Sequence, residues 1–206
     1  MDNSKNSFKN FWDYNKRKVI AGFFLIAFII FAITQCNINP EQKFGILCIS
    51  ETNNTDGTQL MAELKENIDF DKTEEGKQNL EYEHIYIPPT KADMVTLGTN
   101  ETIQARLLSG DASLLILDSE TIYYYEAKGT FKDLTEVADK YNIPAEDRYL
   151  ATDGSVCAIS VDSNSFLKDC SIESEGLYVA IRYPLNGNTE DYTNADAALD
   201  YIISNK

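Results

Sequence analysis

The sequence predicts an α/β domain with a mostly parallel sheet and helices on both faces, preceded by one transmembrane helix. Short apolar runs that suit strands alternate along the chain with segments of helical spacing, the order typical of α/β folds. The run at residues 113–118 holds four consecutive aliphatic residues, as expected of a strand buried on both faces of a parallel sheet. Near the N-terminus, residues 19–36 carry no charge and are almost entirely apolar.

The N-terminal residues predict a membrane topology. Residues 1–18 form a basic arm with five Lys and Arg against two Asp, and three of the basic residues directly precede the apolar run. The uncharged stretch continues to Pro40, and its 22 residues span about 33 Å as a helix, against about 30 Å for a bilayer core. The positive-inside rule keeps the arm in the cytoplasm. We therefore expect a signal anchor at 19–36, a linker at 37–43 and an extracytoplasmic domain at 44–206 in a single-pass protein of the cell membrane.

Two other fates of the apolar segment stay open. A lipoprotein would be lipidated at Cys36, but Gln35 stands where a small residue is usual. A cleaved signal peptide would end in a small-x-small site, which is missing here. The flanking residues thus favour an uncleaved anchor.

The rest of the chain divides into short elements. Apolar runs predict strands at 44–50, 80–87, 113–118, 156–161 and 177–185. Helical spacing predicts helices at 60–68, 99–108, 119–128, 134–141 and 195–203, and a short helix or turn at 164–169. The candidate caps are Asp56 for the first of these helices, Ser119 for the third and Asn194 for the last. A loop is expected at 90–98. The run of tyrosines at 123–125 cannot face one way on a helix, so part of it must be exposed or line a groove.

Composition limits the partners and cofactors. A net charge of −15 argues against nucleic acid or an anionic lipid surface as a partner of the exported domain. The four cysteines, Cys36, Cys48, Cys157 and Cys170, form no CxxC pair, and His84 is the only histidine. This set argues against a zinc site, and we expect no metal and no cofactor. A disulfide among the last three cysteines is possible outside the cytoplasm, with the pairing open.

Candidate binding residues follow three of the predicted strands. In open α/β sheets, ligands bind beyond the carboxyl ends of the strands, and Ser50, Glu51, Asp118, Ser119 and Asp162 stand at those positions. Such an acidic rim suits a cation or a hydroxyl-rich solute better than an anion. The alternative is that Ser119 only caps a helix and the carboxylates are simply solvated.

No sequence pattern indicates catalysis. The chain has no GxSxG, HExxH, P-loop or GxGxxG pattern, and no sequence feature links the single histidine to a particular serine. We therefore expect no catalytic residue and no enzymatic activity. A hydrolase that uses a pair of carboxylates stays open as an alternative.

Three segments, taken in order, resemble bacterial extracellular solute-binding proteins of the periplasmic-binding-protein type 2 fold. They are residues 108–118 (LSGDASLLILD), 129–135 (GTFKDLT) and 154–160 (GSVCAIS). After Ser160 only residues 161–206 remain, whereas a second lobe needs on the order of 100 residues, so the likeness is to a single lobe. The resemblance implies a solute-binding-like domain without catalytic activity that binds a small ligand or a partner protein at the cell surface. A scaffold subunit of a membrane complex is the alternative.

Overall fold

A computed structural model gives the fold of most of the chain beyond the N-terminal segment. It describes residues 12, 14–16, 18, 20, 26, 43–70, 79–88, 93–109, 112–126, 129–183 and 191–206. The chain separates into two compact units, Met1–Glu41 and Gln42–Lys206, of which the second contains the sheet. The predicted anchor at 19–36 lies outside the described residues except for Ile20 and Ile26. None of the helices in the described part of the chain has the length and apolarity needed to cross a membrane.

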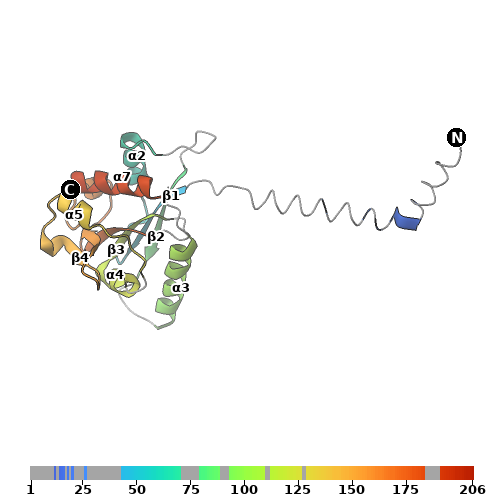
Figure 1. Ribbon diagram of the computed structural model, residues 1–206. Helices are drawn as coiled ribbons and strands as arrows, with labels where there is room; N and C mark the ends of the chain where they lie inside the picture. The colour runs from blue at the N-terminus through green and yellow to red at the C-terminus, as the bar shows by residue number, and fades with distance from the viewer. Residues whose placement is uncertain are drawn as a thin grey trace. The chain divides into compact units, whose positions relative to one another are not determined.

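The first part of the domain alternates strands with helices, as the sequence predicts (Figure 1). The elements are β1 (Lys43–Ser50), α2 (Thr58–Asn67), β2 (Asn79–Tyr86), α3 (Asp93–Ser109) and β3 (Leu114–Asp118). α3 begins at Asp93, so the loop expected at 90–98 is wrong from that residue on. The N-cap of α2 is Gly57 and not the predicted Asp56, whose carboxylate lies one residue earlier and accepts a hydrogen bond from the Thr58 N–H at 3.0 Å.

The second part is richer in short elements. These are α4 (Ser119–Glu126), α5 (Thr135–Lys140), the 3₁₀ helix η1 (Ala145–Asp147), β4 (Arg148–Leu150), β5 (Val156–Ser160), α6 (Ser165–Asp169), β6 (Leu177–Ile181) and α7 (Asp191–Ser204). Asn164 caps α6 by accepting from the Leu167 N–H at 2.9 Å. Asn194, expected to cap the last helix, lies inside α7 because that helix begins at Asp191. β4 was not predicted.

The six strands form one mixed sheet in the order β2-β1-β3-β6-β5-β4. β1 pairs in parallel with β2 and β3, whereas the pairs β3–β6, β6–β5 and β5–β4 are antiparallel. The prediction of an α/β fold is confirmed, but the prediction of a mostly parallel sheet is wrong. One reason is that residues 151–155 join β4 to β5, a connection too short for the crossover that parallel strands need.

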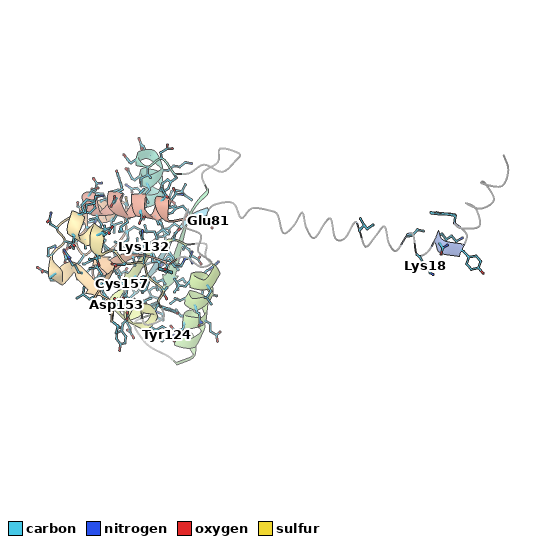
Figure 2. The ribbon with its side chains drawn as sticks, viewed as in Figure 1. Lys18, Glu81, Tyr124, Lys132, Asp153 and Cys157 are labelled. Atoms are coloured by element: carbon cyan, nitrogen blue, oxygen red, sulfur yellow. The ribbon has the colours of Figure 1, made fainter. Side chains whose placement is uncertain are left out.

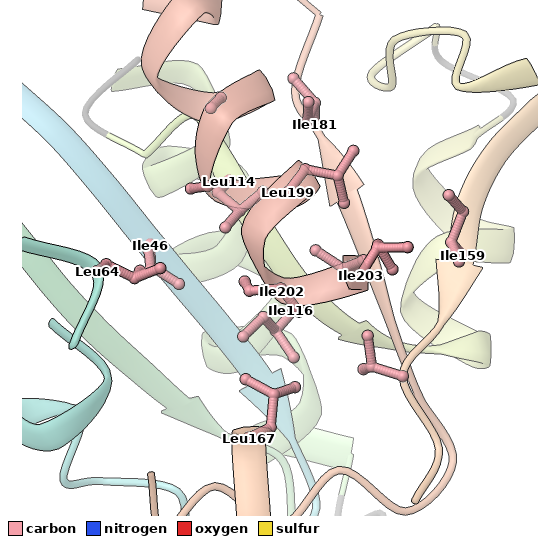
Figure 3. Close-up of a cluster of buried hydrophobic side chains, with 14 of the residues drawn as sticks. Ile46, Leu64, Leu114, Ile116, Ile159, Leu167, Ile181, Leu199, Ile202 and Ile203 are labelled. Carbon is pink, nitrogen blue, oxygen red and sulfur yellow. The ribbon is translucent and has the colours of Figure 1, made fainter. Parts of the chain in front are cut away.

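Helices cover both faces of this sheet. α2 and α3 pack into different cores on opposite faces, as right-handed crossovers require when the chain moves from β1 to β2 and then back past β1 to β3. Two buried clusters follow from this arrangement. We call them the α7-side core, which joins the sheet to α2, α5, α6 and α7, and the α3-side core, which joins it to α3 and α4. Figure 3 shows the α7-side core, to which α7 contributes Leu199 and Ile202 and β3 contributes Leu114 and Ile116.

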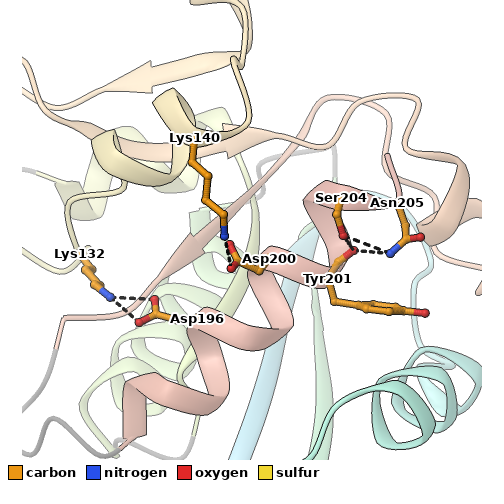
Figure 4. A network of polar contacts seen from close by, with 7 residues as sticks. All are labelled: Lys132, Lys140, Asp196, Asp200, Tyr201, Ser204 and Asn205. Carbon is orange, nitrogen blue, oxygen red and sulfur yellow. Dashed lines mark hydrogen bonds and ion pairs between the residues drawn. The ribbon is translucent and has the colours of Figure 1, made fainter.

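Salt bridges fasten α7 over its core. The Lys132 ammonium lies 2.7 Å from an oxygen of Asp196, and the Lys140 ammonium lies 2.6 Å from an oxygen of Asp200 (Figure 4). Both pairs are partly exposed to solvent, where an ion pair adds little to the free energy of folding. The buried apolar face of α7 therefore supplies most of its attachment.

Close packing at the start of α2 joins that helix to β2. The ring of Tyr82 lies directly against Gly57, and an added Cβ at this glycine would overlap the ring atoms. The Tyr82 hydroxyl donates a hydrogen bond to the Asn54 carbonyl oxygen at 2.6 Å. This position therefore needs a residue without a side chain.

Candidate functional site

A pocket of about 290 Å³ opens where the three parallel strands end. Parallel strands present their carboxyl ends at one edge of the sheet. Here Glu51 follows β1, Ile87 and Pro88 follow β2, and Asp118 is the last residue of β3. The order of these strands also reverses between β1 and β3, which defines the position where open α/β sheets bind ligands. The remaining lining residues come from α3 and α4: Thr99, Asn100, Ile103, Glu120, Thr121, Tyr123, Tyr124 and Tyr125.

The alternation of side chains along β1 decides which residues reach the pocket. Leu47 and Ile49 point into the α3-side core, and Glu51 lines the pocket above that core. Asp118 is fixed differently. Its Oδ1 accepts a hydrogen bond from the Thr121 N–H at 2.7 Å, so Asp118 caps α4 in place of the Ser119 that the sequence suggests.

Three consecutive tyrosines of α4 form an aromatic wall. Tyr125 is buried, while Tyr124 and Tyr123 are 52% and 75% exposed, and all three line the pocket. The rings of Tyr124 and Tyr125 meet edge to face, with centroids 4.9 Å apart and planes at 81° (Figure 2 labels Tyr124). The Tyr125 hydroxyl donates to the Asn100 carbonyl oxygen at 3.4 Å and so links α4 to α3. Burial raises the pKa of Tyr125, so this phenol stays neutral at physiological pH.

The charges of the lining are of one sign. Glu51, Asp118 and Glu120 contribute carboxylates, and none of the described residues that line the pocket is Lys, Arg or His. Ile87, Pro88 and Ile103 supply an apolar surface between these groups. The pocket therefore combines negative charge, aromatic rings and apolar walls.

Ser50 lies on the other face of the sheet. It is fully buried in a polar network at the end of β1, where its Oγ accepts from Thr52 Oγ1 at 3.2 Å and from Asn54 Nδ2 at 3.4 Å. The same Oγ lies 3.1 Å from His84 Nε2. This spacing is that of a nucleophile and its base. However, the hydroxyl is shielded from solvent, and His84 Nδ1 has no hydrogen-bond partner among the described residues that could orient the ring.

Asn54 connects this network to the loop before β6. Its side chain donates to the Glu173 carbonyl oxygen at 3.0 Å and accepts from the Glu173 N–H at 2.9 Å, as a neighbouring strand would. These bonds tie the loop that follows β1 to the loop before β6. They also hold the short segment that carries Glu51.

The other two predicted residues also lie outside the pocket. Ser119 is exposed at the first position of α4. Asp162 is exposed after β5, and its N–H donates to Ser160 Oγ at 3.2 Å. β6 separates β5 from β3 in the sheet, so Asp162 is set apart from the strand ends that form the pocket. Of the five predicted residues, the pocket brings together Glu51 and Asp118.

The cysteines in the described part of the chain are thiols rather than disulfides. Cys48, Cys157 and Cys170 are free and buried. Burial raises the pKa of Cys157 and of Cys170 to about 11 each, so both stay protonated. In the described part of the chain, no group of three or more His, Cys, Asp or Glu side chains could hold a metal ion.

Sequence reasoning missed the contribution of α3 to the pocket. Thr99, Asn100 and Ile103 reach it because α3 lies beside α4 on the same face, a pairing that only the crossover order determines. The tyrosine run did carry a signal, because three adjacent rings on a helix cannot all be buried. Comparisons with protein-family models, with curated proteins and with solved structures found no match.

Proposed function

We propose that this chain is a membrane-anchored extracytoplasmic domain that binds a small ligand in the pocket at the ends of β1, β2 and β3, without catalysing a reaction. The observation that carries the proposal is the position of the pocket at the point where strand order reverses, the usual ligand site of open α/β sheets. Its volume of about 290 Å³ lies at the lower end for small-molecule sites, which favours a compact solute.

The sequence supports the anchored location. The uncharged residues 19–36 form the anchor, with the basic arm in the cytoplasm and the domain outside. The likeness to one lobe of bacterial extracellular solute-binding proteins agrees with this location. One of its three segments, residues 108–118, runs from the end of α3 through β3 to Asp118 of the pocket.

The contacts of Ser50 and His84 support a binding role over hydrolysis. The only histidine of the chain lies beside a serine that is fully buried and already accepts two hydrogen bonds. A carboxylate-pair hydrolase would draw its pair from Glu51, Asp118 and Glu120, of which Asp118 already caps α4.

A thermal-shift experiment tests the binding function. The full-length chain, purified in a non-ionic detergent, is heated with sugars, amino acids, amines and divalent cations. A ligand at 100 times its Kd adds about 2.7 kcal/mol, which raises the Tm of a domain of this size by about 5–10 °C. Asn100→Trp, which fills the pocket from α3, should abolish the shift. Glu101→Trp, one position along α3 and outside the lining, should preserve it.

The opposite outcomes are equally specific. A Tm that no solute class moves contradicts the binding function, and a membrane protein that then co-purifies favours the scaffold role. Turnover of a hydrolase substrate that is lost in Glu51→Gln would replace binding with catalysis.

The location is tested by membrane fractionation and by protease accessibility in intact cells. A domain protected from external protease contradicts the proposed topology.

A further inference from the structure

We propose that the ligand of the pocket is a small organic cation that carries an alkylated ammonium group. This inference rests on the proposed binding function and names the chemical class of its ligand. The juxtaposition that carries it is the edge-to-face pair of Tyr124 and Tyr125 beside the carboxylates of Glu51 and Asp118.

Charge selects a cation. Glu51 and Asp118 bring two carboxylates to a pocket of about 290 Å³, and none of its described lining residues is Lys, Arg or His. An anion would be repelled by these carboxylates, whereas a cation would be attracted to them. Asp118 commits one oxygen to the Thr121 N–H, which fixes the carboxylate in place at the pocket wall.

The aromatic rings select an alkylated cation over a strongly hydrated one. The face of a tyrosine ring carries negative charge and attracts ammonium groups, most strongly when the contact is shielded from water. At 81° to each other, the rings of Tyr124 and Tyr125 form a corner, and Tyr123 extends the wall toward solvent. A corner of this kind surrounds a rounded cation on two sides.

The apolar walls exclude a bare metal ion as the preferred ligand. Ile87, Pro88 and Ile103 cannot replace the water shell of calcium or magnesium, which need cages of oxygen atoms. In keeping with this, the described residues contain no group of three or more carboxylate, histidine or cysteine side chains able to hold a metal. Methyl groups on a nitrogen, by contrast, gain from contact with apolar carbon.

Calorimetric titration of the full-length chain in non-ionic detergent tests this inference with a pair of probes of equal shape. Choline carries the trimethylammonium group, and 3,3-dimethyl-1-butanol replaces its nitrogen with carbon and has no charge. We expect saturable binding of choline, with the alcohol at least about tenfold weaker because it lacks the ionic contribution. Calcium chloride added in excess should not displace choline.

Variants then assign the binding to particular side chains. Tyr124→Leu removes a ring and should weaken choline binding about fivefold, whereas Tyr124→Phe keeps the ring and should bind as the wild type does. Glu51→Gln should also weaken choline about fivefold and leave the alcohol unchanged. Asp162→Asn, which neutralises an acid outside the pocket, is the matched control and should change neither probe.

The results separate this inference from the proposed function. Equal affinities for choline and the alcohol, or displacement of choline by calcium, would overturn the organic cation and leave a binding pocket in place. Equal losses in Tyr124→Leu and Tyr124→Phe would overturn the role of the ring. If the thermal-shift panel finds no ligand of any class and choline produces no heat, both proposals fail.

Discussion

Replacing Gly57 with alanine tests the packing that joins α2 to β2. The backbone at Gly57 has φ −92° and ψ 8°, a negative-φ conformation of the bridge region that other residues also occupy, so most of the cost must come from the added methyl group. That Cβ would overlap Cγ and Cδ1 of Tyr82 and lie 2.5 Å from Cδ2. Cγ is the first atom of the ring, so the ring cannot swing clear as the tip of a flexible side chain could. Either β2 or the start of α2 must move.

The expected cost has two parts. Overpacking of this kind destabilises by about 1–3 kcal/mol. Movement of the ring also breaks the 2.6 Å hydrogen bond from the Tyr82 hydroxyl to the Asn54 carbonyl, worth about 1 kcal/mol. The free energy of unfolding should therefore fall by about 2–4 kcal/mol, which lowers the Tm by about 5–15 °C for a domain of this size.

Thermal unfolding followed by circular dichroism measures the effect, and a second glycine supplies the control. At Gly98, exposed within α3, an added Cβ meets nothing within 4 Å. Gly98→Ala should therefore stabilise the helix by about 0.5–1 kcal/mol. The two substitutions are chemically identical and should have opposite signs. In the Tyr82→Ala background the cost of Gly57→Ala should disappear. An unchanged Tm in Gly57→Ala, or a cost that persists without the ring, refutes the reasoning.

Three further predictions concern the rest of the domain. Asn54→Ala should lower the free energy of unfolding by about 2–4 kcal/mol in urea titrations, because it leaves buried polar groups unpaired, whereas Asn67→Ala on the exposed face of α2 should change it by about 0.5 kcal/mol or less. Burial lowers the pKa of His84 below its ordinary value of about 6.5, so its contribution to stability is complete above pH 6.5 and is lost as the pH falls through that lowered pKa. The drop in Tm between pH 7 and pH 5.5 should therefore shrink in His84→Gln, and an equal drop would contradict this assignment. Ile202→Ala, in the α7-side core, should cost about 2–5 kcal/mol of unfolding free energy by urea titration, while Leu108→Ala, 60% exposed, should be close to neutral.

The sequence predicts the parallel half of the sheet better than the rest. Long apolar runs and clear helical spacing identify β1, β2 and β3 with their intervening α2 and α3, because the crossover connections leave few other arrangements. The direction of β6 is decided by packing in the folded domain. The chain between β5 and β6 is long enough for β6 to run parallel or antiparallel to its neighbours. β4 is three residues long and is defined only by its pairing with β5, so it carries almost no local signal.

The candidate site shows the same division. Glu51 and Asp118 follow from the rule that ligands lie beyond parallel strand ends. Ser50 shares that position along the chain but faces the opposite side, because adjacent residues of a strand point in opposite directions. Asp162 depends on strand order, which places β6 between its strand and the pocket. Position in the sequence therefore located the edge of the sheet, and packing decided which side chains share the pocket.

The position of α7 in the fold affects when the domain can complete its folding. Synthesis makes β1 first and α7 last, yet these two elements share one core, in which Ile46 and Leu199 are both buried. Contacts between the ends of a chain form late, because the intervening segment must first be closed into a loop. Until residues 191–206 are complete, β1 and β3 lack the helix that covers them. A chain that lacks α7 would leave this apolar surface exposed to proteases and chaperones.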